Sequence, residues 1–138
     1  MTYRLDTNAV IALLRNRPNT VRERMRAAAT SGAVTVVSPI VLFELWYGVA
    51  RSQHQRENAE RLRVFLSGVI DVASFDREDA AIAGDLRATL EKAGAPIGPF
   101  DLLIAAQALR LRATLVTANV SEFARIEGLR WQDWSSDG

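Results

Sequence analysis

The amino-acid sequence predicts an α/β fold in which a central, mostly parallel sheet of about five strands lies between two layers of helices. Short apolar segments of strand length, such as residues 34–37 and 114–117, alternate with longer segments of helical periodicity. Several strand-like segments are almost continuously apolar, which is typical of parallel strands covered on both faces. Because no repeat, low-complexity segment or linker interrupts the chain, we expect a single domain over residues 1–138.

Five segments have the length and composition of strands, and helical segments separate them. The strands are expected at residues 3–5, 34–37, 69–72, 114–117 and 129–131, the last at an edge of the sheet. The helices are expected at residues 10–14, 21–30, 39–48, 53–66, 77–93 and 100–111, with a short helix from residue 121. In parallel sheets of this kind the active crevice lies beyond the carboxyl ends of the strands.

Capping residues set the ends of three of these helices. Ser38 and Pro39 fit the cap and the first position of a helix. Asp76 can cap the helix that follows it, and Gly94 is suited to end that helix in a left-handed conformation. Pro99 is expected to open the next helix in the same way as Pro39.

The composition excludes several classes of protein. Cysteine is absent, which excludes disulfides, thiolate metal sites and cysteine nucleophiles. Since no apolar run reaches the roughly 18 residues of a membrane span and the start has no signal-peptide pattern, we expect a cytoplasmic protein without membrane contact. Ten Arg face five acids in residues 1–63, whereas seven basic residues face eleven acids in residues 64–138. The Arg-rich half indicates either a polyanionic partner or a genome that favours Arg codons.

Three acidic residues, Asp6, Glu44 and Asp101, stand in otherwise apolar elements. Asp6 directly follows the first strand, where an ordinary helix cap is the alternative to a functional role. Glu44 is the only charge in its helix, so it needs either a cation or a salt bridge to Arg4 or Arg51. Asp101 is the only charge in the first turns of its helix, where the helix dipole alone could favour it.

Together these acids predict a divalent-cation site. Clustered carboxylates repel one another unless a cation neutralises them. Oxygen ligands select Mg²⁺ or Mn²⁺, because the chain has no cysteine and its single histidine, His54, lies in a polar helix where we expect it to be exposed. We therefore expect metal-assisted chemistry on a phosphate group.

Four motifs resemble those of the PIN-domain ribonucleases in order and spacing. They lie at residues 5–8, in the helix that carries Glu44, at residues 97–106 and at residues 115–123. The ending at residues 128–134 resembles that of VapC toxins of bacterial toxin–antitoxin pairs, so the resemblance covers essentially the whole chain. It implies a PIN-like three-layer α/β/α fold and an Mg²⁺- or Mn²⁺-dependent endoribonuclease that hydrolyses transfer RNA or other structured RNA and inhibits translation.

The resemblance also assigns roles to individual residues. Asp6, Glu44 and Asp101 would be the metal-binding catalytic acids. Asn119, which could equally cap a helix, stands where many relatives have a fourth acid, so the number of metal ions stays open. Supporting residues would be Thr7, Asn8, Thr117 and Glu122. Weaker candidates for contacts with the RNA backbone are Arg15, Arg17 and Arg24.

The partners that the resemblance implies are a VapB-type antitoxin, which would hold the enzyme inactive, and a second copy of the chain. An apolar surface for either partner could be formed by Leu42, Trp46, Tyr47, Val49 and Leu62. The alternative is that most of these side chains belong to the core, which we favour for Leu42.

Three other functions are less consistent with the sequence. A catalytically silent PIN fold that only binds RNA or partners is opposed by the presence of all three acids. Phosphotransfer domains of the haloacid-dehalogenase type and signalling receiver domains also have an Asp after the first strand. They need a second acid near the position of Asn8 and an essential lysine, whereas the only lysine here is Lys92.

Overall fold

In the computed structural model, which describes residues 1–68 and 71–136, five parallel strands form one sheet with helices on both faces. The strands are β1 (Thr2–Leu5), β2 (Val34–Val37), β3 (Asp71–Val72), β4 (Thr114–Val116) and β5 (Arg130–Gln132). Their order across the sheet is β3-β2-β1-β4-β5, and each neighbouring pair is parallel. The expected α/β fold is confirmed, and the sheet that was expected to be mostly parallel is parallel throughout.

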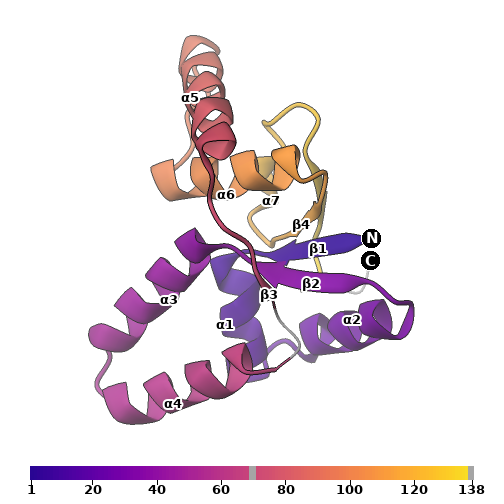
Figure 1. Cartoon of the computed structure of the whole chain (residues 1–138), viewed down its shortest axis with the longest axis vertical. Helices are drawn as coiled ribbons and strands as arrows, with labels where there is room; N and C mark the ends of the chain where they lie inside the picture. The colour runs from indigo at the N-terminus through magenta and orange to yellow at the C-terminus, as the bar shows by residue number, and fades with distance from the viewer. Residues whose placement is uncertain (69–70, 137–138) are drawn as a thin grey trace.

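Two groups of helices cover the two faces of the sheet, as Figure 1 shows. The helices are α1 (Thr7–Arg15), α2 (Asn19–Thr30), α3 (Pro39–Ala50), α4 (Gln55–Leu66), α5 (Arg77–Lys92), α6 (Pro99–Arg110) and α7 (Val120–Phe123). In Figure 1, α1 to α4 lie below the strands and α5 to α7 above them. This is the three-layer arrangement that alternating strands and helices predict.

The capping signals of the sequence act as expected. The Ser38 hydroxyl accepts a hydrogen bond from the backbone N–H of Ile40 at 3.1 Å, and Pro39 opens α3. Gly94, with φ of 71°, follows the end of α5 in the left-handed conformation that glycine adopts most easily. The carboxylate of Asp79 accepts from the backbone N–H of Asp76 at 2.7 Å, which fixes the start of α5.

The strand order of the sheet has a switch point between β1 and β4. From β1 the chain adds β2 and β3 on one side, and β4 and β5 are later added on the other side. Leu5 at the end of β1 pairs with Val116 at the end of β4, and the backbone N–H of Asp6 donates to the Val116 carbonyl at 3.1 Å. Ligands of open parallel sheets bind at such a switch point, beyond the carboxyl ends of the strands.

A buried ionic network joins β1 to α5 and α6. Arg110 donates to the fully buried carboxylate of Asp79 with both Nε and Nη2. Arg4 of β1 is 2% exposed, and both terminal nitrogens of its guanidinium lack a hydrogen-bond partner among the described residues. Burial lowers the pKa of Arg4 to about 10, against the opposing effect of the Asp79 charge. Asp79 therefore has several hydrogen-bond donors within this network, whereas the terminal nitrogens of Arg4 have no hydrogen bond among the described residues.

The structure corrects some expected boundaries and surfaces. β3 begins at Asp71, and residues 69 and 70 of the expected strand lie outside the described residues. Leu62 has no exposed surface and belongs to the core, so its inclusion in a partner surface was wrong. Tyr47 is exposed, whereas Leu42, Trp46 and Val49 are half-buried and pack against the core. Within residues 1–68 and 71–136 no helix is both long and apolar enough to cross a membrane.

Candidate active site

Asp6 lies directly beyond the end of β1, at the switch point of the sheet, and is 4% exposed. Its Oδ1 accepts a hydrogen bond from the backbone N–H of Ala9 at 2.8 Å, which caps α1, and its carboxylate is also hydrogen-bonded to Thr117. Burial raises the pKa of Asp6, the two hydrogen bonds lower it, and the charges of Glu44 and Asp133 raise it again; the net direction is upward. Asp6 therefore caps α1 and also lies at the switch point, so the two roles considered for it in the sequence are compatible.

Glu44 projects from α3 and is half-buried beside the first turn of α1. The Thr7 hydroxyl donates to Glu44 Oε1 at 2.6 Å. The salt bridge considered for Glu44 is absent from the described part of the chain. The guanidinium of Arg51 lies over the Tyr47 ring, 5.3 Å from its centroid, and the two terminal nitrogens of the buried Arg4 have no hydrogen-bond partner among the described residues. Among those residues Glu44 therefore lies near Asp6 without an ion pair to a basic side chain.

Asp101 lies in the first turn of α6 and is half-buried. Burial and a hydrogen bond with Glu122 raise the pKa of Asp101 to about 7, and the charges of Glu122, Glu44 and Asp6 contribute in the same direction. The hydrogen bond from Asp101 lowers the pKa of Glu122. The charges of Asp6 after β1, Glu44 of α3 and Glu122 of α7 thus all act on Asp101 of α6.

A chain of hydrogen bonds links the residues after β4. The hydroxyl oxygen of Thr117, which is 1% exposed, accepts from the backbone N–H of Asn119 at 2.9 Å. The side-chain amide of Asn119 donates to Glu122 Oε2 at 2.8 Å and makes no side-chain cap for α7. Asn119 therefore holds the carboxylate of Glu122, whose charge acts on Asp101.

The residues present suit a divalent cation by their chemistry. All four acids offer the hard oxygen ligands that Mg²⁺ and Mn²⁺ prefer. Burial is the largest cause of the raised pKa of Asp6 and of Asp101, and the charges of neighbouring acids add to it; a bound cation would relieve that repulsion. As the side chains stand, no three His, Cys, Asp or Glu residues in the described ranges lie close enough together to hold one ion. Binding would therefore draw the carboxylates inward.

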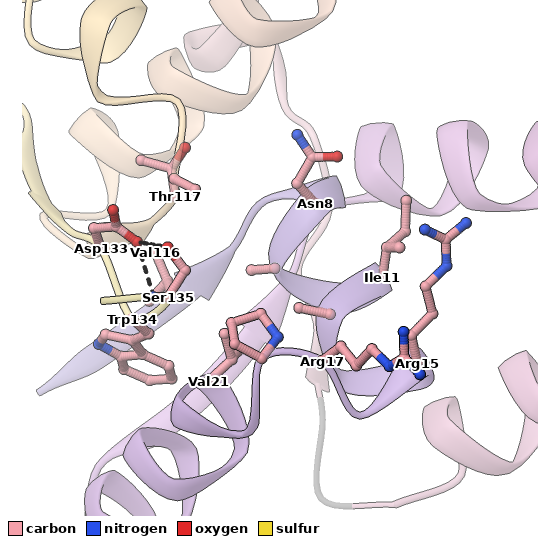
Figure 2. A pocket seen from close by; sticks show the side chains of 14 residues that line it. Asn8, Ile11, Arg15, Arg17, Val21, Val116, Thr117, Asp133, Trp134 and Ser135 are labelled. Atoms are coloured by element: carbon pink, nitrogen blue, oxygen red, sulfur yellow. Dashed lines mark hydrogen bonds between the residues drawn. The ribbon is translucent and has the colours of Figure 1, made fainter. Parts of the chain in front are cut away.

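The remaining expected site residues line a pocket next to the acids. Asn8, Thr117, Arg15 and Arg17 all line it, and Figure 2 shows them around the same hollow. Arg24 of α2 does not line this pocket, so the structure does not bring it together with the other two arginines. His54 is exposed, as expected.

Asp133 is a site residue that the sequence interpretation missed. It follows β5, which pairs with β4, and its charge contributes to the raised pKa of Asp6. The available signal was its position just after the last strand of the sheet, on the same edge as Asp6 and Thr117. Asp133 lies near Asp6 only because β5 pairs in parallel with β4, and the order of the strands is known only from the fold.

A second hollow, of about 390 Å³, lies among the helices of the layer that contains α3, and Glu44 is one of its lining residues. It is a groove bounded by α1, α3 and α4, with Leu14, Leu45 and Leu62 among its apolar lining and Arg61 at its border. Arg15 lines this groove as well as the pocket of Figure 2. Glu44 therefore lines the groove, Asp133 lines the pocket of Figure 2, and Arg15 lines both hollows.

The chain is similar to known proteins over nearly its whole length. The PIN domain model matches residues 3–129. The tRNA(fMet)-specific endonuclease VapC of Shigella flexneri is 38% identical over 98% of this chain and 99% of its own.

Two solved structures share both the fold and the sequence pattern. VapBC2 of Rickettsia felis, bound to a DNA fragment from its promoter, matches with a TM-score of 0.91 and 36% identity over 97% of this chain and 99% of that chain. VapBC-1 of nontypeable Haemophilus influenzae matches with a TM-score of 0.85 and 38% identity over 99% and 100%. This chain belongs to the PIN-domain family and, within it, to the VapC ribonucleases, the toxins of VapBC toxin–antitoxin pairs.

Proposed function

We propose that Asp6, Glu44 and Asp101 are the catalytic acids with which this ribonuclease binds Mg²⁺ or Mn²⁺ and hydrolyses RNA. The observation that carries the proposal is that these three carboxylates, from three different elements, lie near one another at the switch point of the sheet, where the charge of Glu44 contributes to the raised pKa of both Asp6 and Asp101. Glu122 adds a fourth charge beside Asp101. An acidic cluster of this kind is stable at neutral pH when a cation occupies it.

The chain's own residues hold these acids in place. The Ala9 N–H and the Thr117 hydroxyl orient Asp6, and the Thr7 hydroxyl orients Glu44. A bound cation would supply a water molecule of lowered pKa and neutralise charge on the phosphate oxygens. The exposed Arg15 and Arg17, beside the site, are available to the RNA backbone.

We further infer that the substrate is a transfer RNA in the cytoplasm and that its cleavage inhibits translation. The support is the high identity to VapC proteins of Shigella flexneri and Salmonella typhimurium that are named as tRNA(fMet)-specific endonucleases. The partner is a VapB-type antitoxin, in keeping with the VapBC complexes whose toxin chains this fold matches. The expected homodimer stays a prediction, which light scattering at high protein concentration would test.

The experiment is cleavage of purified tRNA by the antitoxin-free chain, followed on denaturing gels. We expect cleavage with Mg²⁺ or Mn²⁺ and none with EDTA. Asp101→Asn should abolish cleavage, whereas Asp85→Asn, which removes an exposed carboxylate from α5, should leave it unchanged.

The outcomes separate the catalytic proposal from its alternative. Unchanged cleavage by Asp101→Asn, with an unaltered circular dichroism spectrum, would overturn the assignment of the acids. If the unmodified chain binds tRNA but cuts it with neither ion, the catalytically silent alternative holds instead.

A further inference from the structure

The pocket of Figure 2 is built from segments far apart in the chain and has a volume of about 210 Å³. Its walls come from α1, from the start of α2, from the end of β4 and from the segment after β5. Ala9, Ala12, Val21 and Trp134 give it an apolar lining. Because drug-sized ligands need about 300–1,000 Å³, this pocket suits something smaller, of the size of a single nucleobase.

The two ends of the pocket differ in charge. At one end lie Asn8, Thr117 and Asp133, and Thr117 is hydrogen-bonded to the catalytic candidate Asp6. At the other end lie Arg15 and Arg17, both exposed and, in the described part of the chain, in no ion pair. The pocket therefore has Asp133 and two polar side chains at one end and two exposed arginines at the other.

The distance between the two ends matches the scale of a nucleotide. Asn8 and Arg15 lie on the same helix, two turns apart, which corresponds to about 10 Å along its axis. Figure 2 shows Asp133 and Trp134 across the hollow from α1, Arg17 at the lower end of α1, and the side chain of Arg15 extending upward beside Ile11. A ligand that fills the pocket would meet apolar groups in the middle and cations at its far end.

An unpaired nucleotide has the complementary chemistry. Its base is a flat ring with a π-face, which apolar and aromatic side chains accommodate in most sites that recognise single-stranded RNA. Its phosphate is a ligand that guanidinium groups bind with paired hydrogen bonds. An amino acid side chain would offer the apolar part alone, and an inorganic anion would offer the charge alone.

We propose that this pocket binds one unpaired nucleotide of the RNA substrate, adjacent to the phosphodiester that is cut, with its base between α1 and Trp134 and its phosphate held by Arg17 and Arg15. The inference rests on the proposed ribonuclease function and adds to it a subsite outside the acidic cluster. Asp133 Oδ1 already accepts from the backbone N–H and the hydroxyl of Ser135, so Oδ2 is the oxygen of this carboxylate that remains available to a ligand in the pocket.

Nucleotide binding can be measured without cleavage. We would titrate the isotope-labelled chain with each of the four 5′-nucleoside monophosphates in EDTA and follow the nitrogen–proton NMR spectrum. The expected result is a saturable shift of the Trp134 indole and of the Ala12 and Val21 amides for at least one nucleotide. Ala12→Met, which extends a side chain into the pocket, should weaken this binding at least tenfold. Absence of any saturable shift at these positions at millimolar nucleotide would overturn the proposal.

Cleavage of tRNA gives the second test, with a variant that cannot disturb the core. Arg17 is exposed, so Arg17→Gln should fold normally and raise KM for tRNA about tenfold with little change in kcat. The matched control is Arg77→Gln, an exposed arginine of α5 that does not line the pocket. Equal KM values for the two variants would contradict the proposal.

The failure of the subsite and the failure of the ribonuclease assignment are distinguishable. If the unmodified chain cuts tRNA and the Arg17→Gln and Ala12→Met variants cut it with unaltered KM, only the subsite is wrong. If the chain cuts no RNA, the nucleotide titration still tests the pocket. If the variants lose antitoxin binding while KM stays constant, the pocket is a protein contact and the proposal fails.

Discussion

The hydroxyl of Thr7 donates to the carboxylate of Glu44 across 2.6 Å, and this single hydrogen bond joins the first turn of α1 to the middle of α3. The two residues are 37 positions apart in the chain, so the bond forms only when both helices are packed. Thr7 directly follows Asp6, and the bond therefore sets the relative position of two of the three catalytic candidates.

We expect Thr7→Val to lower kcat on tRNA about tenfold, because a hydrogen bond to a charged group contributes about 1.5–3 kcal/mol and Val preserves the shape without the donor. Steady-state cleavage assays would measure the effect. Thr7→Ser restores the hydroxyl and should recover most of the activity. A Ser variant as impaired as the Val variant would show that packing of the methyl group, and not the hydrogen bond, is what the site needs.

Arg4→Met should stabilise the protein by about 1 kcal/mol. The guanidinium of Arg4 is buried with both terminal nitrogens unpartnered among the described residues, so its desolvation is poorly compensated, and Arg110 still pairs with Asp79 when Arg4 is replaced by an apolar side chain of similar length. Urea denaturation at pH 7 would give the change in the free energy of unfolding. A loss of more than 1 kcal/mol would show that the attraction between Arg4 and Asp79 outweighs the desolvation of Arg4.

Asp79 should make the stability of the fold depend on pH in the acidic range. Burial would raise its pKa, but the hydrogen bonds from Arg110 and from the Asp76 N–H, with the charges of Arg110 and Arg4, outweigh burial and lower it. A lowered pKa stabilises the folded chain above the pKa of an unfolded Asp, about 3.9, and this contribution is lost as the pH falls through the folded value.

Asp79→Asn should therefore be less stable than the unmodified chain at pH 7, and the two free energies of unfolding should converge as the pH falls below about 4. Urea denaturation at several pH values would measure both curves. Asp85→Asn, an exposed neighbour on α5, is the control and should run parallel to the unmodified chain. A constant gap between the Asp79→Asn and unmodified curves down to pH 2.5 would contradict the predicted role of the ion pair.

Leu62→Ala should destabilise the fold by about 2–5 kcal/mol, because Leu62 has no exposed surface and its truncation leaves a cavity in the core. Val64→Ala on the same helix removes a side chain that is 61% exposed, so it should change the free energy of unfolding by less than about 0.5 kcal/mol. Thermal and urea denaturation would measure both. Similar small effects for the two variants would place Leu62 at a surface after all.

The sheet could be predicted, and the three acids could be singled out as candidates, because both leave local patterns in the sequence. Strands appear as short apolar runs, and Glu44 and Asp101 are each the only charge in an apolar stretch. The pairing order of the strands and the contribution of Asp133 were not predictable in the same way. They depend on β5 pairing with β4, and no local pattern states which strand neighbours which.

The salt bridge between Glu44 and Arg4 that the sequence left open is absent among the described residues for a related reason. Side chains alternate between the two faces of a strand, and Arg4 points to the face that α5 and α6 cover, where Asp79 and Arg110 lie. Glu44 belongs to α3 in the other layer. A salt bridge between the two would have to pass through the sheet, which sequence distance alone could not reveal.

The double role of Asp6 has a genetic consequence. Its Oδ1 closes the first turn of α1, and asparagine caps helices about as well as aspartate. An Asp codon becomes an Asn codon by one transition at its first base, so a single mutational step can remove the charge and keep the helix. Cells that escape the toxin by this route would retain a folded chain that still binds antitoxin, whereas a change to alanine would threaten the fold as well.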